Sequence, residues 1–230
     1  MRLLFFSSFT PFMLVALLVL MLGAMLLFLR WRLRFIHAHP PVVPFQALPL
    51  KGHVVALSRS LDHSFSKTPV DRLTLIPGLG IEGDAHKGAT VQHRSRLATR
   101  GHESNLRQVH LIHAELHSLL RMQGFKGIAA GKLGENILTF GLPLIDYPVG
   151  TRLFIGAETE LEITGLRNPC AQLDTYAKGL MQALLPREKD GEIRRLCGVM
   201  AVIHKGGVIR CRDRIRVQLP PTPCRKLEVV

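Results

Sequence analysis

Residues 148-PVGTRLFIGAETELEITGLRNPC-170 hold two strand-like segments and, after them, a cysteine. The segments 151-TRLFIG-156 and 160-ELEITGL-166 alternate apolar with polar residues, a period of two that is typical of half-buried β-strands. Pro169 then favours an extended conformation at Asn168. A helix-like sequence starts directly after Cys170. The stretch therefore predicts two strands and a turn into a helix, with the cysteine at that turn.

The same alternation recurs along most of the chain from Gly52 onward. Further strands are expected at 53-HVVALSR-59, 72-RLTLI-76, 198-GVMAVIH-204 and 214-RIRVQL-219, with a hairpin at Lys205-Gly206-Gly207. Apolar residues at helical spacing predict two helices, over 109–123 and 171–185. Many short strands and few helices favour a mainly β (α+β) fold, a barrel or sandwich with helices packed on it.

The composition favours an anionic ligand. Thirty Lys and Arg against 17 Asp and Glu give a net charge of +13, which attracts a phosphorylated small molecule, anionic lipid or nucleic acid. We expect no nucleic-acid partner, because one Trp and two Tyr offer few stacking platforms and no DNA-binding motif is present. The four cysteines form no Cys-x-x-Cys pair, which favours free thiols over disulfides or a zinc ribbon.

The N-terminus contains a candidate membrane anchor. Residues 12-FMLVALLVLMLGAMLLFL-29 are apolar and uncharged over a length that can cross the hydrocarbon core as a helix. Arginines follow at positions 30, 32 and 34, which by the positive-inside rule places the rest of the chain on the cytoplasmic side. We therefore expect a single-pass membrane protein with its domain facing the cytoplasm. A cleaved signal peptide, or a true start at Met21 or Met25, is the alternative.

This organisation divides the chain into four parts. They are an anchor at 1–36, a Pro-rich linker at 37–51, the main domain at 52–220 and a C-terminal tail at 221–230.

Two glycine-rich turns hold polar residues that a ligand could contact. The turn 80-GIEGDAHKG-88 contains Asp84 and His86, and 131-GKLGENILTFGLPL-144 contains Glu135 and Asn136. Glycines let backbone amides approach an anion closely. Plain turns with solvated or capping side chains explain the same residues without a ligand. The residues alone leave both interpretations open.

A third polar segment is 105-NLRQVHLIHAEL-116. Its Arg107 and Gln108 precede the first expected helix, where a guanidinium and backbone amides could face a phosphate. Histidines 110, 113 and 117 would share one face of that helix. Because 113-HAELH-117 lacks the arrangement of a His-Glu-x-x-His zinc motif, a solvated or partly buried histidine face is favoured over a metal site.

Cys170 itself admits two interpretations. It is either a small buried side chain at an element boundary or a reactive thiol. The positive end of a helix dipole, with Arg167 nearby, would favour a thiolate, which is a good metal ligand and a good nucleophile.

Taken in order, five segments resemble the MOSC domain, the module named for the C-terminal part of molybdenum cofactor sulfurases. They are 83-GDAHKG-88, 107-RQVHL-111, 134-GENI-137, 148–170 and 207-GVIRCRDRIRV-217. The resemblance implies a MOSC-type β-barrel with a few peripheral helices, here preceded by one N-terminal transmembrane helix. One departure is 210-RCRD-213, where the family has a Gly-Asp pair and this chain has Arg212-Asp213. We therefore expect backbone strain at Arg212.

The resemblance also implies a cofactor and its site. MOSC relatives bind molybdenum cofactor (molybdopterin), a pterin with a phosphate and a dithiolene-held metal, and the family's cysteine falls on Cys170 as the molybdenum ligand. Glu135 and Asp84 would be catalytic proton carriers beside it. The cofactor-binding residues would be Gly83, Asp84, His86, Arg107, Gln108, Gly134, Glu135, Asn136 and Asn168.

Characterised relatives reduce N-hydroxylated compounds or take part in sulfur transfer to the cofactor. The resemblance thus implies an oxidoreductase with a small-molecule substrate and, since no ferredoxin or flavin module is present, external electron donor proteins. A non-catalytic carrier of sulfur or cofactor is the alternative, and a barrel that serves only as an interaction surface is a third. Pyridoxal phosphate is associated with the family's sulfurases, but nothing here resembles the desulfurase domain that binds it.

Overall fold

The computed structural model describes residues 21–27 and 47–230. Residues 21–27 are helical and belong to the expected anchor, the rest of which lies outside the described residues. Within the two described ranges, no helix combines the length and apolar character needed to cross a membrane. The chain divides into two compact units, 1–41 and 42–230, and the fold below is that of the second.

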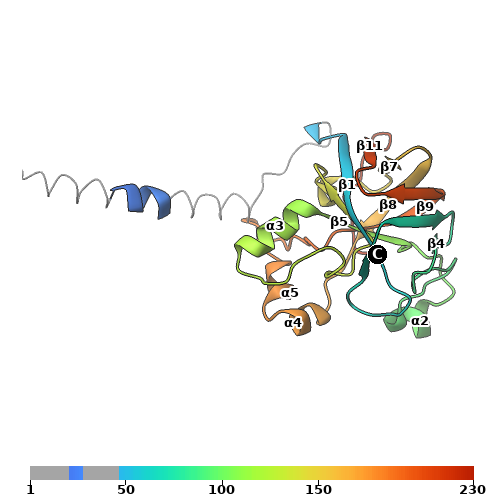
Figure 1. The fold of residues 1–230 in the computed structure, drawn as a ribbon, viewed down its shortest axis with the longest axis horizontal. Helices are drawn as coiled ribbons and strands as arrows, with labels where there is room; N and C mark the ends of the chain where they lie inside the picture. Colours follow the sequence, from blue (N-terminus) through green and yellow to red (C-terminus); the bar gives the residue numbers. More distant parts are fainter. Residues whose placement is uncertain (1–20, 28–46) are drawn as a thin grey trace, which may run out of the picture. The chain divides into compact units, whose positions relative to one another are not determined.

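A closed β-barrel forms the centre of this unit (Figure 1). Seven strands are hydrogen-bonded in the order β11-β7-β8-β9-β5-β6-β1, and β1 pairs with β11 to close the ring. Their bounds are β1 Lys51–Arg59, β5 Val109–His113, β6 Ile137–Phe140, β7 Arg152–Ile155, β8 Thr159–Leu166, β9 Val199–Lys205 and β11 Arg214–Gln218. The expected mainly β fold is confirmed.

The remaining strands lie at the side of the barrel. Strand β2 (Thr68–Val70) extends the barrel sheet beyond β1. A separate three-stranded sheet has the order β10-β3-β4, formed by β10 Gly207–Arg210, β3 Arg72–Ile76 and β4 Gly80–Ile81. The hairpin expected at Lys205-Gly206-Gly207 is therefore wrong, because β10 leaves the barrel there and pairs with β3 instead of β9.

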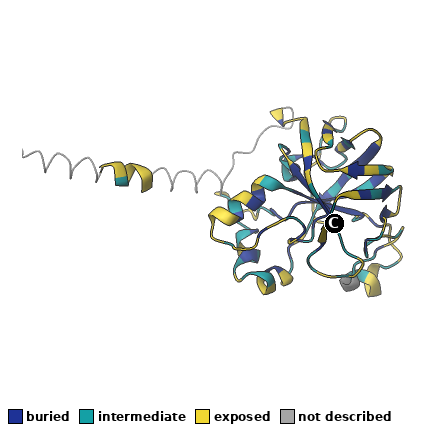
Figure 2. Cartoon of the chain, viewed as in Figure 1, coloured by how far each residue is buried: buried dark blue, intermediate teal, exposed yellow. Residues whose placement is uncertain are grey.

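Alternation along the strands fills the barrel with apolar side chains. In β11, Ile215 and Val217 are buried while Arg214 and Arg216 are exposed. Burial of this kind runs through the whole barrel (Figure 2). Removing large apolar side chains from water supplies the main driving force for this architecture.

Short helices cover one flank of the barrel. They are α3 Ala114–Met122, α4 Gln172–Tyr176 and α5 Leu180–Ala183, with α2 Arg94–Arg100 and the 3-10 helix η2 Leu144–Asp146 elsewhere on the surface (Figure 1). Leu116, Leu120, Leu173, Leu180 and Leu184 join α3, α4 and α5 in a second apolar cluster against the barrel.

The helix expected over 109–123 is wrong in its first part, where Val109–His113 form strand β5 between β6 and β9. Both faces of β5 are covered: Leu111 packs in the barrel core and Ile112 in the helix cluster. A strand buried on both faces shows no alternation, so its apolar run resembles the start of the helix that follows it. Histidines 110, 113 and 117 consequently do not share a helix face.

The helix expected over 171–185 is divided in two. Helix α4 ends at Tyr176, and Ala177 is extended. Gly179 has a left-handed backbone (φ 82°), from which α5 starts.

The last residues of the chain, expected as a tail, lie against the barrel. Glu228 accepts a hydrogen bond of 2.7 Å from the backbone N–H of Leu166, and Val229 forms a parallel bridge with the same residue. Leu166 is the last residue of β8. These contacts therefore support the strand end from which the cysteine turn departs.

Arg212 adopts the strained backbone that the sequence suggested. Its φ of 71° makes it the one non-glycine residue with positive φ in the part of the chain that the structure describes. A side chain in this region costs roughly 1–2 kcal/mol relative to ordinary backbone conformations. The family's glycine at this turn thus has a steric reason.

Arg212→Gly should raise the free energy of unfolding by about 0.5–1 kcal/mol, because relief of the strain exceeds the entropy that glycine adds to the unfolded chain. Arg214→Gly is the matched control, since Arg214 is an exposed arginine in an extended strand. It should lower stability by about 0.5–1 kcal/mol. Urea unfolding measures both, and a loss of stability in Arg212→Gly would contradict the strain.

Candidate functional site

A cavity of about 530 Å³ opens at one end of the barrel, where β1 and β8 end and where β5, β6 and β9 begin. Loops supply most of its wall. The lining residues are His63, Ser64, Phe65, Lys67, His86, His93, Arg96, Arg107, His110, Gly134, Asn136, Arg167, Asn168, Pro169, Cys170, Gln172 and Met200.

The cavity gathers residues that the sequence analysis took from separate motifs. Those that line it are His86, Arg107, Gly134, Asn136, Asn168 and Cys170. The other predicted residues, Gly83, Asp84, Gln108 and Glu135, lie behind this wall.

The cysteine turn forms one side of the cavity. From the end of β8 the chain passes through Arg167-Asn168-Pro169 to Cys170, which is half-buried with its thiol 3.5 Å from Gln172 Oε1. Helix α4 begins at Gln172, as expected, but has only five residues and contributes little dipole. All four cysteines are free, which confirms that prediction.

Arg167 turns inward from the same side. Its guanidinium contacts Cys197 Sγ, on a buried second thiol that the sequence analysis did not single out. It also lies 6.0 Å from the centre of the Phe65 ring. Burial raises the pKa of Cys197, although Arg167 counteracts this, so Cys197 is a neutral thiol next to a cation.

Cations dominate the cavity wall. Lys67, Arg96, Arg107 and Arg167 all line it, and no carboxylate is among the described side chains that do so. Burial, then the charges of Arg96 and Arg167, lower the pKa of Arg107 to about 10. The Nε of Arg107 is buried, and none of the residues that the structure describes accepts a hydrogen bond from it. An anion in the cavity would supply that acceptor and relieve the repulsion among the arginines.

Four imidazoles line the cavity, and the rings of three of them, His63, His86 and His93, lie together. The ring of His86 lies 4.9 Å from that of His63 and 4.6 Å from that of His93. Burial, then the positive charge of Arg107, hold the pKa of His93 well below its ordinary value. His93 is thus neutral, and its buried Nδ1 has no partner. Among the described residues, no group of three His, Cys, Asp or Glu side chains is placed to hold a metal ion.

Asp84 holds the cavity wall together from behind. Its Oδ2 lies 2.5 Å from Lys67 Nζ and accepts a hydrogen bond of 2.9 Å from Asn136 Nδ2. Its Oδ1 accepts the backbone N–H of His86 at 3.0 Å and lies 3.1 Å from His86 Nδ1. One carboxylate therefore fixes three lining residues that come from three distant segments.

The charge of Asp84 is set by these contacts. Burial alone would raise its pKa, but the hydrogen bonds from His86 and the ammonium of Lys67 outweigh burial and hold the pKa well below its ordinary value. Asp84 is therefore ionised, and it forms a buried ion pair with Lys67, whose side chain is only 5% exposed. Such a pair depends on both partners, because either charge alone would be buried without compensation.

Glu135 occupies the turn below the cavity wall. Its carboxylate accepts the backbone N–H groups of Gly131 at 2.7 Å and Leu133 at 3.2 Å, and it lies 3.6 Å from His117 Nε2. Burial raises the pKa of Glu135 to about 7, although the two backbone donors oppose this. The geometry assigns Glu135 to shaping the 131–135 turn, one residue from the cavity.

Gln108 and Gly83 also support the wall without facing the cavity. Gln108 Oε1 accepts the backbone N–H of Ile203 at 2.9 Å and so ties β5 to β9. Gly83 has φ 72°, and a Cβ there would lie 2.7 Å from Arg59 Nη1. Gly134, which does line the cavity, has φ 84°.

Several lining residues were not predicted as site residues. Lys67, His63 and Phe65 come from the stretch 60-SLDHSFSKTP-69, which contains no motif and reads as a solvated loop. A lysine in such a loop carries no sign of burial, because its partner Asp84 is distant in sequence. Arg96 and His93 lie in another segment without a motif.

The family model described as the MOSC domain matches residues 98–216. This range includes the cysteine turn, Arg107, the 131–137 turn, five of the seven barrel strands and the start of β11. The chain belongs to the MOSC domain family. The family is associated with molybdenum cofactor binding.

Solved structures show the same MOSC fold at low sequence identity. The crystal structure of the YuaD protein from Bacillus subtilis is similar with a TM-score of 0.63 and 22% identity, over 75% of this chain and 98% of that one. YiiM from Geobacillus stearothermophilus is similar with a TM-score of 0.54 and 15% identity, over 77% of this chain and 80% of that one. YiiM from Escherichia coli is similar with a TM-score of 0.51 and 17% identity, over 77% of this chain and 74% of that one. A comparison with curated proteins gives no match.

Asp84→Asn should lower the free energy of unfolding of this MOSC domain by about 3–5 kcal/mol, because it leaves the Lys67 ammonium buried and unpaired. Adding Lys67→Met should recover part of the loss if charge, rather than shape, is responsible. Glu103→Gln is the control: it removes the exposed Arg100–Glu103 pair and should change stability by about 0–1 kcal/mol. Similar losses in Asp84→Asn and Glu103→Gln, measured by chemical unfolding, would show that the buried pair is unimportant.

Stability should fall as the pH drops below 6.5. Burial lowers the pKa of His110 well below its ordinary value and that of His117 to about 4, so both are neutral in the folded chain. Below pH 6.5 they bind protons only when the chain unfolds. Their contribution to the free energy of unfolding is complete above pH 6.5. As the pH falls from 6.5 to the pKa of the folded state, it decreases by about 1.4 kcal/mol per pH unit for each histidine.

Glu135, with its raised pKa, acts in the opposite direction, so the test compares variants across pH. His117→Gln should flatten the pH dependence between pH 4 and 6.5 by about one proton, whereas His102→Gln, at an exposed histidine, should leave it unchanged. Equal slopes in His117→Gln and the wild type would refute this assignment.

Proposed function

We propose that this MOSC protein is a membrane-anchored, molybdenum-cofactor-dependent oxidoreductase that reduces N-hydroxylated compounds. The supporting observation is the cavity, which places a half-buried thiol among four cations. Among the described residues, no carboxylate lines it and none accepts a hydrogen bond from the buried Nε of Arg107. This set of donors suits a ligand with an anionic group and a soft metal.

The residues present fit molybdenum cofactor. Arg107 and Arg96 would hold its phosphate, because guanidinium groups bind phosphate oxygens in pairs. Cys170 would ligate molybdenum, for which a thiolate is a suitable soft ligand. Gly134, with no side chain, and Asn168 would border the pterin. When bound, the cofactor supplies a metal centre that exchanges two electrons with the substrate.

The chain itself would supply protons. Reduction of an N–OH group to N–H consumes two electrons and two protons and releases water. Lys67 and His86 line the cavity, and both are held by Asp84. Burial lowers the pKa of Lys67 although Asp84 counteracts it, which makes its proton easier to transfer. In this proposal Asp84 positions the two proton donors, and Glu135 supports the neighbouring turn.

The remaining parts of the proposal rest on the sequence. The anchor at 1–36 would hold the domain at the cytoplasmic face of a membrane, and external electron donor proteins would supply the electrons. The alternative, a sulfur carrier, is favoured by one observation: the Cys170 thiol is partly exposed at the cavity wall, where it could hold a persulfide.

The purified full-length protein should contain molybdenum and pterin in near-equal amounts and should reduce a hydroxylamine or amidoxime with an artificial electron donor. Cys170→Ser should abolish this reduction, while Cys224→Ser, at a half-buried thiol that does not line the cavity, should retain it. Arg107→Gln should lower the pterin content, because it removes a phosphate ligand. Protein that stays free of metal after cofactor loading would overturn the proposal.

Mass spectrometry of the intact protein discriminates the sulfur carrier. One additional sulfur on Cys170, without turnover of the hydroxylamine, would favour the carrier over the reductase.

A further inference from the structure

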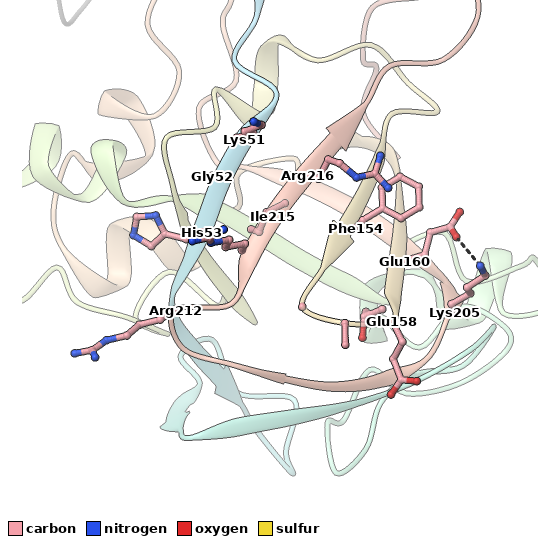
Figure 3. Close-up of a pocket in the computed structure, with 14 residues that line it drawn as sticks. Lys51, Gly52, His53, Phe154, Glu158, Glu160, Lys205, Arg212, Ile215 and Arg216 are labelled. Carbon is pink, nitrogen blue, oxygen red and sulfur yellow. Dashed lines mark ion pairs between the residues drawn. The ribbon is translucent and has the colours of Figure 1, made fainter.

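A second, larger hollow of about 1160 Å³ lies at the other end of the same strands (Figure 3). It is lined by the start of β1, the turn between β7 and β8, the end of β9 and the start of β11. None of the residues that line the candidate cavity takes part in it. This hollow is called the basic groove below, because its exposed side chains are mainly cationic.

Four cations of the basic groove have no acidic partner. Lys51 pairs in register with Arg216 across β1 and β11, and His53 with Arg214, so these basic side chains lie side by side. Arg212 projects from the turn before β11 (Figure 3). Within the described residues, none of Lys51, Arg212, Arg214 and Arg216 forms an ion pair.

Of the two carboxylates that line the groove, Glu160 is neutralised by ion pairs. Glu160 is bound by Arg152 at 2.6 Å and by Lys205 at 3.6 Å. Asp213, beside the groove, accepts the backbone N–H of Arg210. Glu158 is the one lining carboxylate without an ion pair in the described chain, so the groove remains positively charged.

The groove has the form of a docking face. The guanidinium of Arg216 lies 4.0 Å from the centre of the Phe154 ring, which holds it on the outer surface of the sheet (Figure 3). The unpaired cations come from β1, from β11 and from the turn before β11, so they spread over an open sheet face. A small ligand would need polar groups that converge, whereas a broad anionic surface can meet all four cations at once.

We propose that the basic groove binds the anionic phospholipid headgroups of the membrane that holds the N-terminal anchor. The inference rests on the anchor in the proposed function, and on the path of the chain. Lys51, in the groove, is the first residue of β1, and about 20 residues separate it from the apolar segment, a tether that can reach about 70 Å. Contact between groove and headgroups would fix the orientation of the domain on the membrane.

The charge of the membrane matches that of the groove. Cytoplasmic leaflets are anionic, and each Lys or Arg near such a surface strengthens binding about fivefold, which corresponds to about 1 kcal/mol. The groove includes the first three residues of β1, Lys51 to His53, and the cavity lies beyond its last residue, Arg59, so the six-residue rise between His53 and Arg59, about 20 Å, separates them. A domain docked through this face would keep its cavity clear of the headgroups, where soluble electron donors could reach it.

Cys211 offers a built-in reporter of this contact. It is an exposed thiol between Arg210 and Arg212, in the turn that enters β11. The full-length protein would be reconstituted into nanodiscs of phosphatidylcholine, alone or mixed with phosphatidylglycerol. Labelling of Cys211 by an uncharged polymer-linked maleimide would be followed by peptide mass spectrometry. We expect Cys211 to react several times more slowly in the anionic discs, and high salt to abolish the difference.

Lys51→Gln/Arg214→Gln should weaken the contact roughly thirtyfold and restore fast labelling. Lys126→Gln/Lys178→Gln is the matched control, because it removes the same charge from exposed lysines outside the groove and should leave the protection intact.

Equal labelling in neutral and anionic discs, or a chain that incorporates into neither, would overturn the inference. Protection that requires an added acidic protein rather than anionic lipid would also overturn it. Molybdenum and pterin contents are measured separately, so failure here is distinguishable from failure of the proposed function.

Discussion

The buried carboxylate of Asp84 is the constraint on which the candidate site depends. A charge this far from water must be compensated, and here the ammonium of Lys67 and the donors of His86 and Asn136 compensate it. Those donors belong to three segments far apart in sequence, so satisfying one carboxylate brings three parts of the wall together. The same arrangement places Lys67 and His86 on the cavity wall, where the proposed chemistry would use their protons. Stability and proposed chemistry therefore rest on one set of hydrogen bonds.

The local pattern predicted the fold better than it predicted the site wall. Strands such as β8 and β11 alternate visibly because one face meets the core and the other meets water. Strand β5 gave no such signal because it packs on the barrel with one face and on the helices with the other. The cavity residues Arg107, Asn136 and Cys170 belong to recognisable motifs, whereas Lys67 gains its place only through a contact with Asp84. Partners distant in sequence leave no trace in the local pattern.

Two groups of cations lie at the two ends of one barrel. At one end the arginines are partly buried and repel one another, as the lowered pKa of Arg107 shows, which suits a ligand that is enclosed. At the other end the cations of the basic groove are exposed and lie on a sheet face. Burial thus separates two kinds of positive surface that the composition alone cannot distinguish. The barrel strands hold the two apart.

The pairing of β1 with β11 also governs how the domain reaches this structure. Lys51 meets Arg216, so the ring closes between segments more than 150 residues apart along the chain. Contacts of such long range make folding slow, because the chain loses the entropy of closing the loop before the contacts between the strands form and offset it. During synthesis the ring stays open until β11 has left the ribosome. Until then, the edges of β1 and β7 that will pair with β11 have no partner. An emerging chain with two open sheet edges is a natural client for a chaperone.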